Sequence, residues 1–197
     1  MTSGDLDKAR IRSERLALRD ALSVDERTAK SLDIAEHGAD AIRFEAGTIV
    51  SGFMPIRSEA DLRPLMERLR IKGARICLPV ILDRETIAFR EFEAGSELVK
   101  TGFGTTGPDA HAAVLYPAIL LVPLSAFDAT GQRIGYGAGH YDRAIARLHA
   151  KGLETKLIGI AFDCQEVPSV PAQAHDVALD AILTESGMRF FNSRTAE

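Results

Sequence analysis

The sequence predicts an α/β fold: a single domain with a mostly parallel β-sheet flanked by helices. Short apolar runs alternate along the chain with longer segments of helical periodicity, which is the pattern of a parallel sheet with crossover helices. The 197 residues are 46% hydrophobic, enough for one sizeable core. No repeat or long linker divides the sequence. We therefore expect one domain over residues 1–197, with a frayed tail at 192–197.

Residues 6–22 form the first expected helix. Its cations recur at intervals of 4, 3 and 4 residues, which places them on one face: Lys8, Arg12, Arg15 and Arg19. An apolar stripe adjoins them: Ile11, Leu18 and Leu22. A cationic face is commonly solvated, but a helix of this kind can also lean over a phosphate site. Both interpretations stay open at this point.

The next elements follow from capping and periodicity. Ser23 as N-cap with Glu26 three residues later is a capping box, and it opens a second helix that we expect to end at about residue 44. The apolar run 47–53 is a strand. A helical pattern at 62–71 ends near Gly73.

Further strands lie in the middle of the chain. The run 74–81 is apolar, and Pro79 predicts that its ladder ends there. The segment 86–92 alternates as a strand near a sheet edge does. The glycine- and proline-containing segment 95–112 is expected to be mostly loop, and 118–124 a buried strand.

The last part of the chain contains another helix and two strands. Residues 141–150 have apolar side chains on one helical face, and 157–162 is an apolar strand. After a proline-containing loop, 181–184 is a short strand.

Charge and composition exclude several classes of protein. The formal charge of −4 argues against a general nucleic-acid binder. Cys77 and Cys164 match no zinc or redox spacing. The sequence has neither an 18-residue apolar segment nor the hydrophobic region of a signal peptide. We expect a cytoplasmic monomer that binds small molecules, without a nucleic-acid or membrane partner.

Residues 133–142 carry the strongest functional signal. Three glycines alternate between a strand and a helix start: Gly135, Gly137 and Gly139. Such a backbone can approach a ligand closely, and free amides at a helix start attract anions. Arg133 and Asp142 flank the loop, which suits a nucleotide polyphosphate and its magnesium. A tight turn that needs glycine for structural reasons alone is the alternative.

Two other segments contain candidate side chains. Glu59 could accept hydrogen bonds from a heterocyclic ligand, and Met54 could either contact a flat ring or pack in the core. Asp61 is explained by a helix start. Asp176 could lie near a metal or form an Asx turn, and His175 could be a pH switch, a metal ligand or neither.

Together these stretches resemble the 5-formyltetrahydrofolate cyclo-ligase family over nearly the whole chain. Lys8 and Arg12 match its K-x3-R element. The segment from Phe127-Asp128 to Asp142 matches F-D…G-x-R-x-G-x-G-x-G-x-Y-D. Weaker matches are Glu59 with Asp61, Phe103-Gly104 with Pro108, Gly159–Phe162 with Gln165, Pro171, and His175-Asp176.

The resemblance implies a NagB/RpiA/CoA-transferase-like fold and an ATP- and Mg²⁺-dependent conversion of 5-formyltetrahydrofolate to 5,10-methenyltetrahydrofolate. The implied catalytic residues are Lys8, Arg12 and Arg133. The implied ATP site is Lys8, Arg12, Arg133, Ile134, Gly135, Tyr136, Gly137, Ala138, Gly139, His140 and Tyr141, with Asp142 and Asp176 on the metal. The implied folate site is Met54, Glu59, Phe103, Tyr136, Gly137, Ala138, Gly139 and His140, with Tyr141 also lining the cleft.

Some positions depart from the family pattern. His140 stands where an aromatic residue is common, and Tyr136 where some members have arginine. Two alternatives therefore stay open: a non-catalytic folate- or nucleotide-binding relative, and a sugar-phosphate isomerase or CoA-transferase-type enzyme on a related scaffold.

Overall fold

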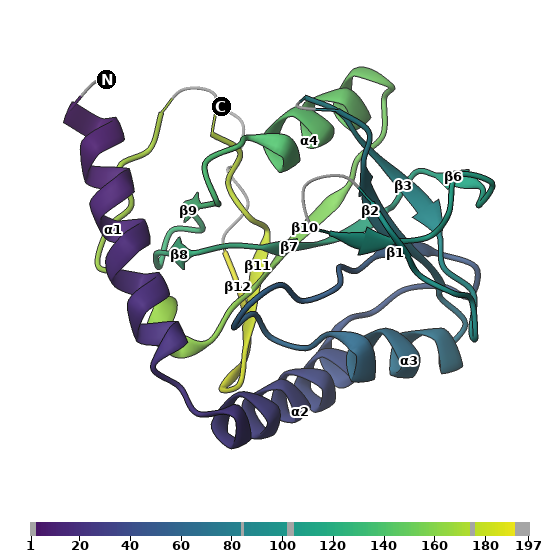
Figure 1. The fold of residues 1–197 in the computed structure, drawn as a ribbon, viewed down its shortest axis with the longest axis horizontal. Helices are drawn as coiled ribbons and strands as arrows, with labels where there is room; N and C mark the ends of the chain where they lie inside the picture. Colours follow the sequence, from purple (N-terminus) through teal and green to yellow (C-terminus); the bar gives the residue numbers. More distant parts are fainter. Residues whose placement is uncertain (1–2, 84, 102–104, 174–175, 192–197) are drawn as a thin grey trace.

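The fold is α/β, as expected, with a central sheet between layers of helices (Figure 1). The computed structural model describes residues 3–83, 85–101, 105–173 and 176–191. An eight-stranded sheet has the order β12-β11-β10-β7-β1-β2-β3-β6. Its central strands are parallel: β11 (Ala181–Thr184), β10 (Lys156–Ile160), β7 (Ile119–Pro123), β1 (Ile49–Ser51) and β2 (Arg75–Ile81).

The two edges of the sheet are antiparallel. On one side β12 (Gly187–Phe190) pairs with β11. On the other side β3 (Ile87–Glu91) pairs with β2, and the short β6 (Val114–Leu115) follows it. Among its described residues, the segment that was expected to be mostly loop contains a two-stranded ladder of β4 (Val99–Lys100) and β5 (Thr106–Gly107).

Helices cover both faces of the sheet. In Figure 1, α2 (Val24–Ala41) and α3 (Arg63–Ile71) lie below the sheet, and α4 (His140–Ala150) lies above it. Each face has its own apolar core. Leu65 and Leu69 of α3 pack in the first core, and Ile145 and Leu148 of α4 pack in the second. These cores fix the ends of the strands between them. None of the described helices is long and apolar enough to cross a membrane.

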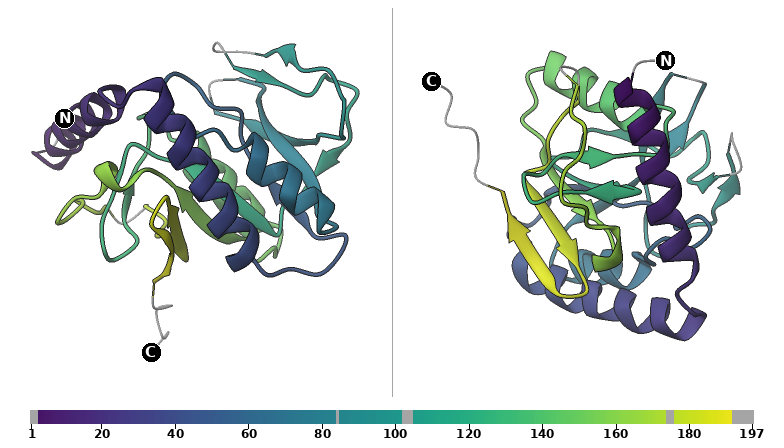
Figure 2. Two further views of the ribbon diagram at one scale, coloured as in Figure 1. Left: turned by 90° about the horizontal axis from the view of Figure 1, so that it is seen from below. Right: turned by 90° about the vertical axis from the view of Figure 1, so that its left-hand side faces the viewer.

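The N-terminal helix α1 (Ser3–Asp20) belongs to neither layer. It lies beside a hairpin of β8 (Ala126–Phe127) and β9 (Arg133–Ile134), which follows the carboxyl end of β7 (Figures 1 and 2). It also contacts the 3₁₀ turn Asp163–Gln165, which follows β10. The helix therefore crosses the edge where ligands of parallel sheets bind.

Most expected elements are confirmed, but two expectations were wrong. The second helix ends at Ala41, before residue 44. Pro79 does not end its strand, since it lies opposite Phe89 and pairing continues to Ile81. The parallel ladder between β1 and β2 ends at Cys77. On that side of β2 no strand pairs with Pro79, so the N–H that proline lacks is not needed for a ladder hydrogen bond. Strands of two residues, such as β6, β8 and β9, leave no clear periodic signal.

The capping box at the start of α2 generates the first prediction. Ser23 Oγ accepts from the Glu26 amide at 3.2 Å, and the Glu26 carboxylate accepts from the Ser23 amide at 2.8 Å. Ser23→Ala should lower the free energy of unfolding by about 1 kcal/mol, because the amide at the helix start loses its partner. Urea denaturation measures this, with the exposed Thr28→Ala as the control. Equal stability of the two variants would contradict the capping role.

Candidate functional site

A cavity of about 300 Å³ lies beyond the carboxyl ends of β1, β2 and β7. It brings together segments that are far apart in the sequence. Its lining residues are Phe53, Met54, Ile56, Glu59, Pro79, Ile81, Ile87, Thr105, Thr106, Pro123, Arg133, Gly135, Tyr136, Ala138, Gly139, His140, Tyr141 and Asp142. Most of this surface is apolar, with a few polar groups that converge on it, which is the usual character of a small-molecule site.

The glycine loop forms one wall of this cavity. Gly137 and Gly139 have φ angles of 95° and 66°, which other residues rarely adopt, and Gly139 is the N-cap of α4. Gly135 has no such angle, so its role is different: the carbonyl of Gly135 accepts a hydrogen bond from Arg12 Nε at 2.7 Å. The backbone requirement predicted for the loop is thus confirmed at two of the three glycines.

Arg133 and Asp142 form an ion pair at the base of this loop, with 2.5 Å between Nη2 and Oδ1. The Arg133 side chain is 5% exposed, and its other terminal nitrogen donates to the carbonyl of Val177. Asp142 is more open and lines the cavity. Arg133, the expected phosphate ligand, and Asp142, an expected magnesium ligand, therefore neutralise each other's charge in this structure.

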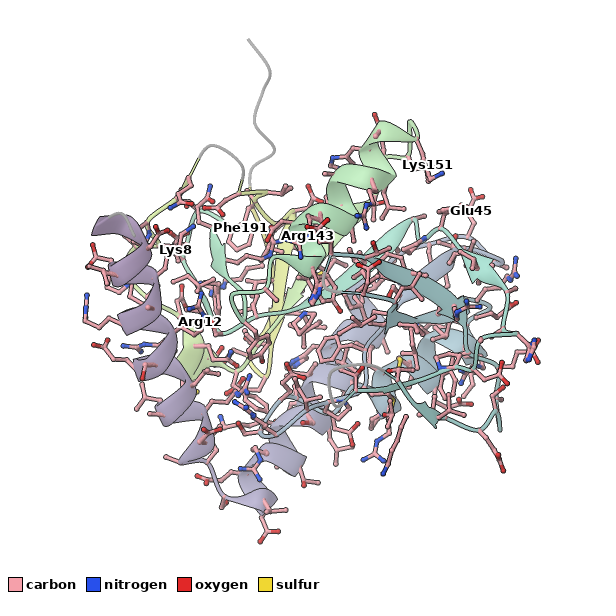
Figure 3. All side chains as sticks on the ribbon, turned by 45° about the horizontal axis from the view of Figure 1, so that its top comes forward. Lys8, Arg12, Glu45, Arg143, Lys151 and Phe191 are labelled. Atoms are coloured by element: carbon pink, nitrogen blue, oxygen red, sulfur yellow. The ribbon has the colours of Figure 1, made fainter. Side chains whose placement is uncertain are left out.

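The cationic face of α1 points into the protein. Lys8 Nζ pairs with Asp176 Oδ2 at 2.6 Å, and Arg15 donates to the carbonyls of Cys164 and Glu166. Figure 3 shows Lys8 and Arg12 on the side of α1 that faces the rest of the molecule. This excludes the interpretation of a solvated face.

The apolar stripe predicted for α1 is partly formed: Ile11 packs against a small apolar cluster and Leu22 against the first core, whereas Leu18 is exposed. The cations therefore add polar contacts along a helix that has few apolar ones.

Glu59 is the buried carboxylate of the cavity. Its Oε2 accepts from the Ile56 amide at 2.9 Å, while Oε1 has no hydrogen bond of standard geometry within the described part of the chain. Burial raises the pKa of Glu59, while a hydrogen bond from the Tyr136 hydroxyl, the hydrogen bond from the Ile56 amide and the charge of Arg19 act in the opposite direction. A buried carboxylate that lines a cavity can also accept a hydrogen bond from a ligand N–H.

Arg19 was not among the expected site residues. Its Nη1 donates to the Tyr136 hydroxyl at 2.6 Å and its Nε to Ser58 Oγ at 3.0 Å. In the sequence, the helical spacing places Arg19 on the cationic face of α1, and this spacing is the signal that connects it with the site. Sequence alone does not say which side chain such an arginine reaches.

The other expected residues fall into four groups. Met54, His140 and Tyr141 line the cavity, as expected for the folate site. Ile134 is instead buried in an apolar cluster with β8, so its side chain is not available to a ligand. Phe103 and His175 lie outside the described residues. Asp61 pairs with Arg63 at the start of α3, in agreement with the helix-start interpretation.

The two expected metal ligands, Asp142 and Asp176, have different surroundings. Asp142 lines the cavity, whereas Asp176 is held by Lys8 of α1. Among the described residues there is no group of three or more histidine, cysteine, aspartate or glutamate side chains arranged for a metal ion. Lys8 and Arg12 are not among the lining residues of the cavity, and Arg12 reaches the glycine loop through the Gly135 carbonyl.

The fold and the cavity define a class: an α/β protein that binds small molecules beyond the carboxyl ends of a parallel sheet, beside a glycine loop flanked by cations. The model of the 5-formyltetrahydrofolate cyclo-ligase family matches residues 5–185. The chain belongs to this family.

Individual relatives agree with this assignment. A 5-formyltetrahydrofolate cyclo-ligase of Escherichia coli (strain K12) is 34% identical over 143 residues, which cover 70% of this chain and 78% of the relative. One from Haemophilus influenzae is 25% identical over 182 residues, or 89% and 96% of the two chains. The NMR structure of Aquifex aeolicus 5,10-methenyltetrahydrofolate synthetase superposes with a TM-score of 0.80 at 27% identity and covers 96% of both chains.

The polar attachment of α1 generates the second prediction. Lys8→Met together with Arg12→Met should accelerate amide hydrogen exchange in α1 strongly and leave α2 unchanged, because the helix loses two of its polar contacts and has little apolar contact to replace them. Mass spectrometry of exchange in α1 peptides is the measurement. The control is Arg10→Met on the exposed side of the helix, where Arg10 pairs only with Glu14. Unchanged exchange in the double variant would show that other contacts hold α1.

Proposed function

We propose that the protein is an ATP-dependent 5-formyltetrahydrofolate cyclo-ligase, which forms 5,10-methenyltetrahydrofolate, ADP and phosphate. The observation that carries the proposal is the pairing of a buried carboxylate, Glu59, with a glycine loop and its neighbouring cations around one cavity. Glu59 suits the N–H groups of a pterin, and the loop suits phosphate oxygens. Membership of the family supports the same activity.

The chemistry needs both substrates in one place. The formyl oxygen of 5-formyltetrahydrofolate is a poor leaving group, so attack of this oxygen on the γ-phosphorus of ATP, with departure of ADP, converts it into a good one. N10 of the substrate then attacks the formyl carbon of this iminium phosphate, N10 releases its proton to solvent, and phosphate leaves with the oxygen. Phosphoryl transfer depends mainly on positioning and on neutralisation of charge.

The side chains divide this work between them. Lys8, Arg12 and Arg133 would hold the ATP phosphates around the glycine loop, since arginine offers a fork to phosphate oxygens and lysine a point charge. Met54 and the ring of Tyr141 would lie against the folate, with Glu59 fixing its orientation. His140 offers a flat ring at the same cavity. The apolar lining would exclude water, which would otherwise hydrolyse the activated intermediate.

A magnesium ion fits the carboxylates that are present. Mg²⁺ in nucleotide sites is typically held by one or two carboxylates together with phosphates and water, and Asp142 and Asp176 would supply these carboxylates. Both are ion-paired in the structure, with Arg133 and Lys8 respectively. Each cation would therefore be released toward the phosphates when its carboxylate turns to the metal. The ion would neutralise charge on the phosphoryl group.

A direct assay tests the proposed reaction. Purified protein with ATP, Mg²⁺ and 5-formyltetrahydrofolate should produce the near-ultraviolet absorbance of the methenyl product, and omission of ATP should abolish it. Folate binding without product would identify a non-catalytic relative instead. A folded sample with neither binding nor product would contradict the proposal.

The role of Glu59 generates the next prediction. Glu59→Gln should raise the KM for 5-formyltetrahydrofolate roughly tenfold or more, because a hydrogen bond to a charged group contributes about 1.5–3 kcal/mol. The KM for ATP should change little. Steady-state kinetics measure both, with the exposed Glu67→Gln on α3 as the control.

The same residue predicts a pH dependence. Since burial raises the pKa of Glu59, its carboxylate becomes protonated at a higher pH than an exposed one, and kcat/KM for the folate should fall as the pH decreases through that pKa. Glu59→Gln should remove this acid limb. An unchanged acid limb in the variant would assign it to another group.

A further inference from the structure

We infer that Arg19 is a positioning residue that locks two cavity-lining segments, 54–61 and 133–142, onto the end of α1. The inference depends on the proposed function only for the identity of the ligands. Arg19 does not line the cavity and is 1% exposed, so it acts through its neighbours and does not touch substrate.

The contacts of Arg19 join three elements. From α1, its Nε donates to Ser58 Oγ at 3.0 Å, and Ser58 immediately precedes Glu59. Its Nη1 donates to the Tyr136 hydroxyl at 2.6 Å, and its guanidinium lies 5.7 Å from the centre of the Tyr136 ring. Tyr136 lies between Gly135 and Gly137 in the glycine loop. One side chain therefore fixes the segment of Glu59 relative to the loop.

A second contact strengthens this attachment. The hydroxyl of Ser58 donates to the carboxylate of Asp20, the last residue of α1. Ser58 is thus held from both sides by consecutive residues of the helix end, and it is 5% exposed. A shift of α1 would move Ser58 and, with it, the carboxylate of Glu59.

The charge of Arg19 also acts on Glu59. The other groups that act on this carboxylate are the Tyr136 hydroxyl and the Ile56 amide. Tyr141, on α4, lies within electrostatic range, and the same cavity is lined by Arg133, His140 and Asp142. Arg19 is the cation that lowers the pKa of Glu59 against the effect of burial. It therefore favours the ionised form of the folate acceptor as well as its position.

The burial of Arg19 beside Glu59 lowers the stability of the folded protein. Arg19 Nη2 is buried without a hydrogen bond of standard geometry to the described residues. Such an atom loses its hydration without full compensation, and replacement of a buried charged group by a well-packed apolar side chain is often neutral or stabilising. A role in positioning accounts for an arginine here better than a role in stability does.

The experiment compares Arg19→Met with the wild-type protein. The expected result is a rise of roughly tenfold or more in the KM for both substrates, since the charge-assisted contacts to Ser58 and Tyr136 are lost together. The acid limb of kcat/KM for the folate should move to higher pH. Arg19→Lys should raise the KM values less than Arg19→Met does, because lysine retains the positive charge but cannot donate to Ser58 and Tyr136 with the planar geometry of a guanidinium. Arg10→Met, on the exposed side of α1, serves as the control.

The results distinguish a positioning role of Arg19 from a purely structural one. A lower melting temperature with unchanged KM values and an unchanged pH profile would show a purely structural role and overturn the inference. If Arg19→Met does not fold, Ser58→Ala removes the contact to the segment of Glu59 while it keeps Arg19, and should still raise the KM for 5-formyltetrahydrofolate. Wild-type KM values in that variant would also overturn it. Failure of the proposed function is distinct, since the wild-type protein itself would then form no methenyl product.

Discussion

The inward orientation of the cationic face of α1 is the interaction on which the rest of the site depends. A helix normally covers a domain with apolar side chains, whereas α1 meets the protein through cations that reach carbonyls, hydroxyls and a carboxylate. These acceptors belong to loops at the carboxyl ends of the strands. The helix thereby holds, from outside the cavity, the loops that form part of its wall.

Charge balance accounts for two of the cations that gather there. Lys8 is neutralised by Asp176 and Arg133 by Asp142, so neither buried cation lacks a partner. A buried charge without a partner is strongly destabilising, and these pairs prevent that cost. In the proposed site, the same two cations would become available to the phosphates when their carboxylates turn to a magnesium ion.

The sequence predicted the fold and much of the site, for identifiable reasons. Apolar runs and capping residues located the helices and the central strands, and the glycine spacing located the loop at Gly137 and Gly139. The two-residue strands, such as β6, β8 and β9, were not predicted because two residues carry no periodicity. Pro79 was misread because its effect depends on where the neighbouring strand ends. Arg19 was missed because its partners, Ser58 and Tyr136, are distant in sequence.

A crystal structure with a non-hydrolysable ATP analogue and Mg²⁺ tests the central claim most directly. We expect the phosphates to lie between α1 and the glycine loop, in contact with Lys8, Arg12 and Arg133, while Arg19 keeps its hydrogen bonds to Ser58 and Tyr136. Phosphates bound away from α1, or Arg19 withdrawn from Tyr136 to bind them, would contradict it.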